Sequence, residues 1–582
     1  MKLQDLFRTL GASVREYKRD SILAPVFITG EVVFECLIPF IMAKMIDHLG
    51  GTGMGPVIRY GLLLLILAAC SLICGVLSAR FAATASTGFA KNLRQDIYFR
   101  IQDFAFQDID QFSVSSLITR MTTDVTNVQN AFQMMIRIAF RAPLMLIFSV
   151  VMCLAISPRM SLIFLAAIPA IGIIIFLIMR RVIPFFRRIF KKYDRMNNSV
   201  EENVSGIRVV KAFVREEYEK EKFWKASEEV RSDFTAAEKI MALLSPVMMF
   251  FIYLVMLLIC VIGSQIIIRT KGALLTTGEL SSLMNYGVQI LASMMMVSMV
   301  FVMITMAQES ANRIAEVLQH ESSLTSPANG RTDVPDGSIV FDHVSFRYRR
   351  DSHSNALSDI SVHIPSGSTV GIIGGTGSSK STMIQLIPRL YDVSEGAVTV
   401  GGHDVREYDL DSLRNAVAVV LQKNVVFSGT IRDNLRWGDA GASDEEIQRA
   451  CHLACADEFI DQLPDGYDTR ITQGGTNISG GQKQRLCIAR ALLKKPKVLI
   501  FDDSTSAVDT KTDAAIRRAM AEEIPDTTKI IIAQRISSVQ DADQILVLDD
   551  GRIAESGTHE ELLEKHGIYR EIYDSQVKGK EE

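Results

Sequence analysis

The segment GIIGGTGSSKST at residues 371–382 decides the fold of this chain. It follows an apolar stretch typical of a buried strand, and it fits the phosphate-binding pattern GxxxxGK[ST] at every position but one. Ser379 stands where the last glycine is usual, so a serine must accept the backbone conformation that the loop requires. The spacing predicts a strand, a glycine-rich loop and the start of a helix, which together indicate an α/β nucleotide-binding domain.

The same segment supplies the candidate phosphate contacts. Backbone N–H groups of residues 375–379 are expected to surround the phosphates, Lys380 to reach the β and γ groups, and the Ser381 hydroxyl to bind Mg²⁺. The predicted contacts are Gly374, Gly375, Thr376, Gly377, Ser378, Ser379, Lys380, Ser381 and Thr382. The sequence therefore predicts ATP and Mg²⁺ as ligands.

A second stretch, VLIFDDSTSAVD at 498–509, nearly completes an ATP-hydrolysing site. The apolar run 498–501 indicates a buried strand that delivers Asp502 to Mg²⁺. A glutamate that orients the attacking water is expected next, and Asp503 occupies its place. Because the aspartate carboxylate is set back by one C–C bond, it does not reach that water as a general base must. We predict that this chain binds ATP better than it hydrolyses it.

A third segment, NISGGQKQR at 477–485, completes a set of motifs that resembles the ATP-binding cassette (ABC) transporters, specifically the exporter half-transporters. The resemblance covers essentially the whole chain. It implies that two cassettes enclose two ATP molecules, each held by the phosphate loop of one cassette and the SGGQ segment of the other. The residues of this chain that would serve the partner's ATP are Ser479, Gly480, Gly481 and Gln482.

Other positions acquire roles only through this resemblance. Tyr348 resembles the aromatic residue that stacks on adenine, and Gln422 resembles the glutamine that links Mg²⁺ to the membrane domain. Residues 506–509 resemble the loop that crosses to the opposite site.

Besides Ser379, three positions depart from the family pattern. Gln534 replaces a histidine that contacts the γ-phosphate, Gln473 replaces a glutamate before SGGQ, and Asp503 replaces the catalytic glutamate. A glutamine donates a hydrogen bond but cannot become an imidazolium. We therefore interpret Asp503, Gln534 and Gln422 as the catalytic positions of a degenerate site. With SGGQ intact on the other side of the sandwich, these replacements resemble the degenerate half of a heterodimeric exporter, whose other, different half-transporter carries the glutamate. The alternative is a homodimer with a slow aspartate base.

The first half of the chain is apolar. Hydrophobic residues make up 48% of the sequence and the mean hydropathy is +0.20, which is high for a soluble protein. A membrane-spanning helix needs about 20 apolar residues. The six predicted spans are 22–45, 58–79, 135–156, 160–180, 243–268 and 281–306.

The predicted fold is thus a membrane α-helical domain with six transmembrane helices, of the ABC exporter type, fused to an α/β P-loop nucleotide-binding domain. The expected boundaries are 1–310 for the membrane domain, 311–336 for a linker rich in helix breakers, and 337–582 for the cassette. The cassette is expected to combine a mainly parallel core, an antiparallel edge sheet and a helical subdomain around 430–490.

The polar stretches 80–134 and 181–242 hold most of the basic residues of this half, so they are predicted to be cytoplasmic, as are both termini. Their helical periodicity predicts that they continue the membrane helices. By resemblance, coupling helices are expected within 109–125 and 201–219. Residues 1–20 read as an interfacial helix rather than a signal peptide.

Two features bear on the transported molecule. Glu31 and Glu35 fall one turn apart in the first span, where a charge is costly. They are expected to attract a cationic amphiphile, to pair with Arg137 or Arg141, or to lie near the lipid interface. The sixth span is rich in methionine, which suits a cavity for varied apolar ligands as well as ordinary core packing.

The functional prediction is ATP-driven export of hydrophobic or amphiphilic compounds across the cytoplasmic membrane by alternating access. A lipid or lipopeptide flippase would share every motif, and an ATP-gated channel or regulator would also tolerate a degenerate site. The formal net charge of −4 is too small to indicate a nucleic-acid partner.

Overall fold

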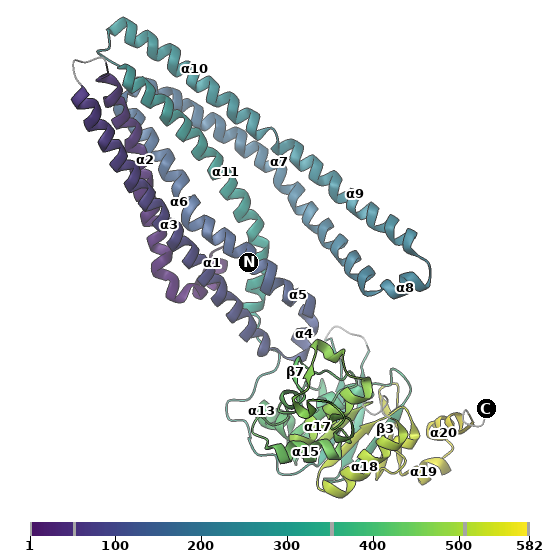
Figure 1. The fold of residues 1–582 in the computed structure, drawn as a ribbon. Coiled ribbons are helices and arrows are strands. Elements are labelled where there is room, and N and C mark those ends of the chain that lie inside the picture. Colours follow the sequence, from purple (N-terminus) through teal and green to yellow (C-terminus); the bar gives the residue numbers. More distant parts are fainter. Residues whose placement is uncertain (1–2, 50–53, 350–353, 504–508, 579–582) are drawn as a thin grey trace. The chain divides into compact units, whose positions relative to one another are not determined.

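The computed structural model describes residues 3–49, 54–349, 354–503 and 509–578. Its residues fall into two compact units, which are shown in Figure 1 and described separately here. The helical unit comprises Met1–Gln102 and Ser115–His320, and the cassette unit comprises Asp103–Val114 and Glu321–Glu582.

The helical unit is built from long apolar helices. Six stretches in the described part of the chain are long and apolar enough to cross a membrane, and each of the six predicted spans lies within one of them. The main helices are α2 (Lys18–Asp47), α3 (Met54–Gln102), α6 (Val125–Ile156), α7 (Pro158–Ser205), α10 (Leu244–Thr270) and α11 (Thr277–Gln319).

Local sequence signals set the ends of these helices. Pro158 opens α7 at its first position, where a missing N–H costs nothing. Thr276 and Glu279 form a reciprocal capping box that starts α11. The helix α10 ends at Thr270 and is followed by Lys271, whose φ of 53° is left-handed.

The predicted extension of the membrane helices is confirmed, because α3 continues to Gln102 and α7 to Ser205. In Figure 1, α7 and α9 (Glu216–Met241) run side by side to the short helix α8 (Ile207–Ala212) at the end of the hairpin. In the cassette unit, α4 (Phe106–Phe112) starts three residues before the predicted stretch, because the N–H of Ala105 bonds to Asp108 and caps the helix there. It is followed by α5 (Val114–Thr119) and the π-helical turn η2 (Arg120–Asp124).

The N-terminal segment is not a single helix. It consists of α1 (Leu3–Gly11) and the 3₁₀ turn η1 (Ala12–Tyr17), which breaks at Arg15 where φ is 40°. The helix α2 follows directly.

The cassette unit has the predicted α/β core. Its main sheet has the order β12-β11-β3-β10-β9-β6, and all neighbours are parallel except β11 and β12. The strands are β3 (Thr369–Gly374), β6 (Val417–Val420), β9 (Val498–Asp502), β10 (Thr528–Ile532), β11 (Gln544–Asp549) and β12 (Arg552–Gly557).

The remaining elements also agree with the predicted class. An antiparallel sheet has the order β2-β1-β4-β5, with β2 (Leu357–Ile364), β1 (Ile339–Phe346), β4 (Glu395–Val400) and β5 (His403–Asp404). A small ladder pairs β7 (Gly429–Thr430) with β8 (Arg470–Ile471). The helices are α12 (Lys380–Leu386), α13 (Leu410–Ala416), α14 (Ile431–Leu435), α15 (Asp444–Leu453), α16 (Asp457–Ile460), α17 (Gly480–Leu493), α18 (Thr510–Glu523), α19 (His559–Glu564) and α20 (Ile568–Lys578).

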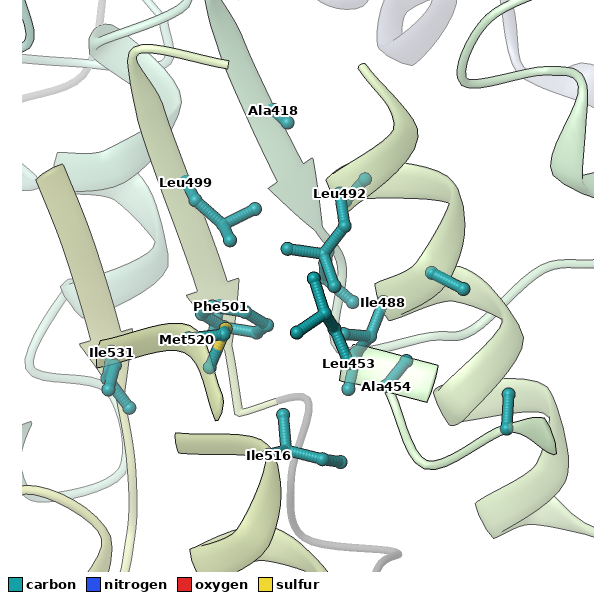
Figure 2. Close-up of a cluster of buried hydrophobic side chains, with 14 of the residues drawn as sticks. Ala418, Leu453, Ala454, Ile488, Leu492, Leu499, Phe501, Ile516, Met520 and Ile531 are labelled. Atoms are coloured by element: carbon teal, nitrogen blue, oxygen red, sulfur yellow. The ribbon is translucent and has the colours of Figure 1, made fainter. Parts of the chain in front are cut away.

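An apolar core fixes the main sheet against the helices beside it (Figure 2). Leu499 and Phe501 of β9 face Ile488 of α17 and Met520 of α18, and all four are 2% exposed or less. Burial of each such side chain contributes about 1.5–3 kcal/mol. This packing holds β9 in place, with the carboxylates of Asp502 and Asp503 at its carboxyl end.

Candidate functional site

The phosphate loop lies between β3 and α12, as the sequence predicts. Its first glycine is required for close packing, since a Cβ on Gly374 would lie 2.1 Å from the carbonyl oxygen of Leu548. The Lys380 Nζ donates to the carbonyl oxygens of Gly374 (2.9 Å) and Gly375 (2.7 Å), so the loop curls around the ammonium group. Burial lowers the pKa of Lys380.

Ser379 adopts the backbone that a glycine would. Its φ of 67° and ψ of 27° are left-handed, and it forms the N-cap of α12. A left-handed conformation costs an L-residue about 1–2 kcal/mol. The serine is therefore compatible with the loop geometry, at some cost in conformational energy.

Two oxygen groups meet where Mg²⁺ is expected. The Ser381 hydroxyl donates to Asp502 Oδ1 at 2.7 Å, which joins the start of α12 to the end of β9. Asp502 is buried, and this burial, together with the nearby charge of Asp503, raises the pKa of its carboxyl. Hydroxyl and carboxylate oxygens are the ligands that Mg²⁺ prefers, so the residues present fit that ion.

Asp503 is held by two glutamine side chains. Its Oδ2 accepts from Gln534 Nε2 at 2.7 Å and from Gln422 Nε2 at 3.3 Å. Its backbone φ is 46°, and its N–H donates to the carbonyl oxygen of Ile532 at 3.1 Å. The three residues predicted at the catalytic positions therefore meet at one carboxylate oxygen.

Tyr348 lies beside the phosphate loop with 41% of its surface exposed. Its hydroxyl bonds to Thr382 Oγ1 (3.0 Å) and Gln385 Oε1 (3.3 Å) at the start of α12. The ring meets Tyr391 edge-on at a centroid distance of 5.3 Å. An exposed aromatic ring next to a phosphate loop is suitably placed to stack on a base.

The SGGQ segment forms the start of α17, far along the chain from the phosphate loop. Ser479 and Gln482 make a reciprocal capping box: Ser479 Oγ accepts from the Gln482 N–H at 3.2 Å, and Gln482 Oε1 accepts from the Ser479 N–H at 2.8 Å. Ser479 and Gly480 are exposed. A 14-residue helix whose N-terminus is exposed is suited to an anion.

The loop 506–509 and Gln473 are the remaining family positions. Of the loop 506–509, residues 506–508 lie outside the described part of the chain, and Asp509 caps α18 by accepting from the N–H groups of Lys511 and Thr512. Gln473 is exposed in the turn Gln473–Gly475, before SGGQ.

The structure adds residues to the site that the sequence reading missed. Gln576 of α20 donates from Nε2 to the Gln534 carbonyl oxygen (2.8 Å) and accepts at Oε1 from the Ile536 N–H (3.0 Å), so it fixes the backbone beside Gln534. Tyr391 donates to Asp110 of α4 at 2.8 Å, which joins this helix to the ring behind Tyr348. No periodicity or motif marks these pairs, because their members lie 42 and 281 residues apart.

A phosphate-binding α/β unit joined to six helices of membrane-crossing length defines a membrane-bound ATPase. Family models agree with both parts: "ABC transporter transmembrane region" matches residues 21–294 and "ABC transporter" matches residues 357–506. The chain is 37% identical to the uncharacterized ABC transporter ATP-binding protein YfiB of Bacillus subtilis, with 95% of this chain and 96% of that protein covered. It is 33% identical to the uncharacterized ABC transporter ATP-binding protein Rv1273c of Mycobacterium tuberculosis, with 98% of each covered.

A solved structure extends the likeness to the whole fold. A bacterial Atm1-family ABC exporter with ATP bound superposes with a TM-score of 0.83 at 26% identity, over 97% of this chain and 99% of that one. The chain belongs to the ABC transporter family, as a half-transporter of the exporter type that carries its transmembrane region and its ATPase domain in one polypeptide. It is a multi-pass membrane protein that binds ATP and drives transport across a membrane.

Proposed function

We propose that this chain is the degenerate-site half of a heterodimeric exporter that moves hydrophobic or amphiphilic compounds out across the cytoplasmic membrane. The proposal rests on the hydrogen bonds that hold the Asp503 side chain. One oxygen of its shortened carboxylate accepts from the amides of Gln534 and Gln422. A general base needs a carboxylate directed at the attacking water within about 3 Å.

The other groups at this site support binding of ATP rather than its hydrolysis. Lys380, Ser381 and Asp502 keep their family identities, and Ser381 and Asp502 would hold Mg²⁺ through their oxygens. The bound ion would offset the negative charge of the phosphates. Gln534 donates an amide hydrogen bond but cannot carry a proton between two groups. Nucleotide is expected to stay at this site through several turnovers of the other.

The intact SGGQ segment supports a second, competent site. Ser479 and Gly480 are exposed at the N-terminus of α17, where they would meet the γ-phosphate of an ATP held by another cassette. A different half-transporter that carries the catalytic glutamate would supply the remaining groups. Hydrolysis would then occur mainly at that site.

The helical hairpin of α7 and α9 supports a partner chain. The helix α8 at its tip has no buried residue in the described structure. Val209, Phe213 and Val214 at this tip are 60%, 73% and 81% exposed. Exposed apolar side chains clustered on a charged surface mark an interaction site. A second half-transporter is the proposed occupant of this tip.

The proposed cycle is alternating access with the cassettes and both termini in the cytoplasm. ATP at both sites would bring the cassettes together, and α4 and α8 would transmit that closure to the long helices. Hydrolysis at the competent site would return the transporter to its inward-open state.

The test begins with the native mass of the tagged chain purified from its host membrane. A complex of this 64.6 kDa chain with a different chain of similar size is expected. A mass of twice this chain would contradict the heterodimer and leave Asp503 at both sites.

The roles of the two sites are tested by ranking variants of that complex. Asp503→Ala is expected to change ATP turnover by less than about twofold, because Asp503 is not the effective base. Replacement of the partner's catalytic glutamate by glutamine is expected to reduce turnover by at least about a hundredfold. A larger loss of turnover in Asp503→Ala than in the variant of the partner's glutamate would contradict the assigned roles of the two sites.

A further inference from the structure

Three charged side chains meet inside the helical unit. Arg141 of α6 bonds through Nη1 to Glu31 Oε1, and through Nη2 to both carboxylate oxygens of Glu35 at 2.8 Å each. The two glutamates lie one turn apart on α2. Of the two partners that the sequence left open, the structure selects Arg141, and we call these three residues the acidic triad.

The triad carries an unbalanced charge. Two carboxylates and one guanidinium sum to −1, and the triad lies within helices of membrane-crossing length. Glu31 is only 8% exposed, and its Oε2 is a buried oxygen without a hydrogen-bond partner in the described residues. An uncompensated charge in apolar surroundings is costly, and such groups mark ligand or ion sites.

A cavity of about 360 Å³ opens beside the triad. Its polar lining comes from Glu35 of α2 and from Asn285 and Gln289 of α11, and its apolar lining includes Ile38, Met42 and Met145. Ligand pockets span about 300–1,000 Å³, so this volume suits one compact molecule. Glu35 belongs to both the triad and the cavity lining, so one carboxylate of a triad with a net charge of −1 lies at the cavity wall.

We propose that this cavity binds a monovalent organic cation. The charged group of the ligand would lie against Glu35 and complete the charge of the triad. Its apolar body would contact Met42 and Met145, whose flexible thioether side chains adapt to varied shapes. The amides of Asn285 and Gln289 supply hydrogen-bonding groups at the same wall.

Arg141 has a positioning role in this site. It holds both carboxylates in place, so that they carry one net charge instead of two. A dication would leave an excess positive charge in the cavity, and an anion would meet the Glu35 carboxylate directly. The arrangement therefore selects a single positive charge.

This inference rests on the proposed export function, because a binding site within the membrane helices is useful only for a transported or regulating molecule. The test measures binding without nucleotide, so it does not depend on which ATP site hydrolyses. If the heterodimer assignment fails, the native mass changes and the binding result remains interpretable.

The experiment compares two probes of similar shape and opposite charge. Labelled tetraphenylphosphonium and tetraphenylborate are equilibrated with the purified, assembled transporter in lipid nanodiscs. Saturable binding of the phosphonium, at least about tenfold tighter than that of the borate, is expected. Equal binding of the two probes would overturn the proposal.

Variants of the triad locate the site. Glu35→Gln is expected to weaken phosphonium binding by at least about tenfold, since a charge pair at close range contributes more than this in a partly buried site. Glu309→Gln removes an exposed carboxylate of α11, the helix that carries Asn285 and Gln289, and as the matched control it is expected to leave binding unchanged. Equal losses in both variants would overturn the assignment to the triad.

A second variant covers the case in which Glu35→Gln does not assemble. Met42→Trp fills the cavity and leaves every charge in place, so it is expected to abolish saturable phosphonium binding. Full retention of binding by this variant would show that the probe lies elsewhere. A triad that holds a proton instead of an organic cation would show no saturable phosphonium binding at neutral pH in the unmodified protein, which also contradicts the proposal.

Discussion

Asp503 illustrates at the scale of one residue how side-chain length and hydrogen-bond partners act together. Its Oδ2 accepts two amide N–H groups, from Gln534 at 2.7 Å and Gln422 at 3.3 Å. Both donors occupy acceptor positions of this one oxygen and fix the orientation of the carboxylate. The same contacts hold the side chain away from the role of a mobile base.

A double variant measures how much catalysis these two positions remove. Asp503→Glu with Gln534→His restores a longer carboxylate and an imidazole, so we expect hydrolysis at this site to rise by at least about tenfold. The measurement is ATP turnover of a complex whose partner glutamate is replaced by glutamine. In that complex only hydrolysis at the site of residue 503 is measured.

Recovery is expected to be partial, because Ser379 and the partner's SGGQ segment also shape the site. Asp503→Asn with Gln534→His is the control, since it adds the imidazole without a base. Turnover equal to that of the competent site would show that the other residues matter less than we infer.

The sequence predicted the individual ligands of the ATP site better than their partners. Lys380, Ser381 and Asp502 follow from a motif in which backbone spacing places each group. The contact of Gln576 with Gln534 depends on how α20 returns to the sheet. The choice of Arg141 for Glu31 and Glu35 depends in the same way on the packing of α2 against α6.

At the scale of elements, α4 is the clearest example of a helix stabilised by its surroundings. It has 7 residues, too few to be stable alone. Asp108 accepts from the Ala105 and Ser323 N–H groups, Asp110 accepts from Tyr391, and the Phe106 ring lies 6.3 Å from that of Tyr391. These contacts lie within the cassette unit and lead to the ring that faces Tyr348.

Removal of the Tyr391 hydroxyl tests whether this contact couples transport to ATP use. Tyr391→Phe deletes a hydrogen bond to a carboxylate, which contributes about 1.5–3 kcal/mol. We expect ATP binding to be unchanged and substrate transported per ATP hydrolysed to fall severalfold. The measurement pairs transport and ATPase rates in the same proteoliposomes.

Tyr408→Phe is the matched control, because the Tyr408 hydroxyl donates to the Val400 carbonyl oxygen within the cassette and its ring is fully buried. It is expected to lower stability without changing the ratio of transport to hydrolysis. A similar ratio in the two variants would argue against a coupling role for Tyr391.

Whole helices were more predictable than the short elements between them. Helical periodicity and few breakers in the polar stretches indicated that α3 and α7 extend well beyond the spans, and the structure confirms both extensions. The start of α4 at Phe106 was missed because the side chain that caps it comes from Asp108 within the helix. Ala105, at the N-cap position, has no side chain that could accept a hydrogen bond. The break in the helical backbone at Arg15 was not predicted, because the turn Ala12–Tyr17 contains no glycine or proline.

At the scale of the whole molecule, the tip at α8 bears on assembly. Phe213 is 73% exposed, and full burial of such a side chain contributes about 1.5–3 kcal/mol. Phe213→Ser is therefore expected to weaken association with the partner by at least about tenfold while leaving expression of this chain intact. The amount of partner that copurifies with the tagged chain, measured across protein concentrations, checks this.

Leu274→Ser provides the comparison. Leu274 is 61% exposed in the turn between α10 and α11, at the end of α10 opposite to the one that adjoins α9. The same loss of apolar surface there is expected to leave copurification unchanged. Equal loss in both variants would indicate a general effect on folding.

The pairing of Gln534 with Asp503 also bears on how this site could regain activity by mutation. In the genetic code, one base separates aspartate from glutamate codons and one base separates glutamine from histidine codons. A change at position 503 alone would place a longer carboxylate against the Gln534 amide, which now lies 2.7 Å from the Asp503 oxygen. Restored hydrolysis at this site would therefore need two separate base changes, one in each partner of the Gln534 and Asp503 contact.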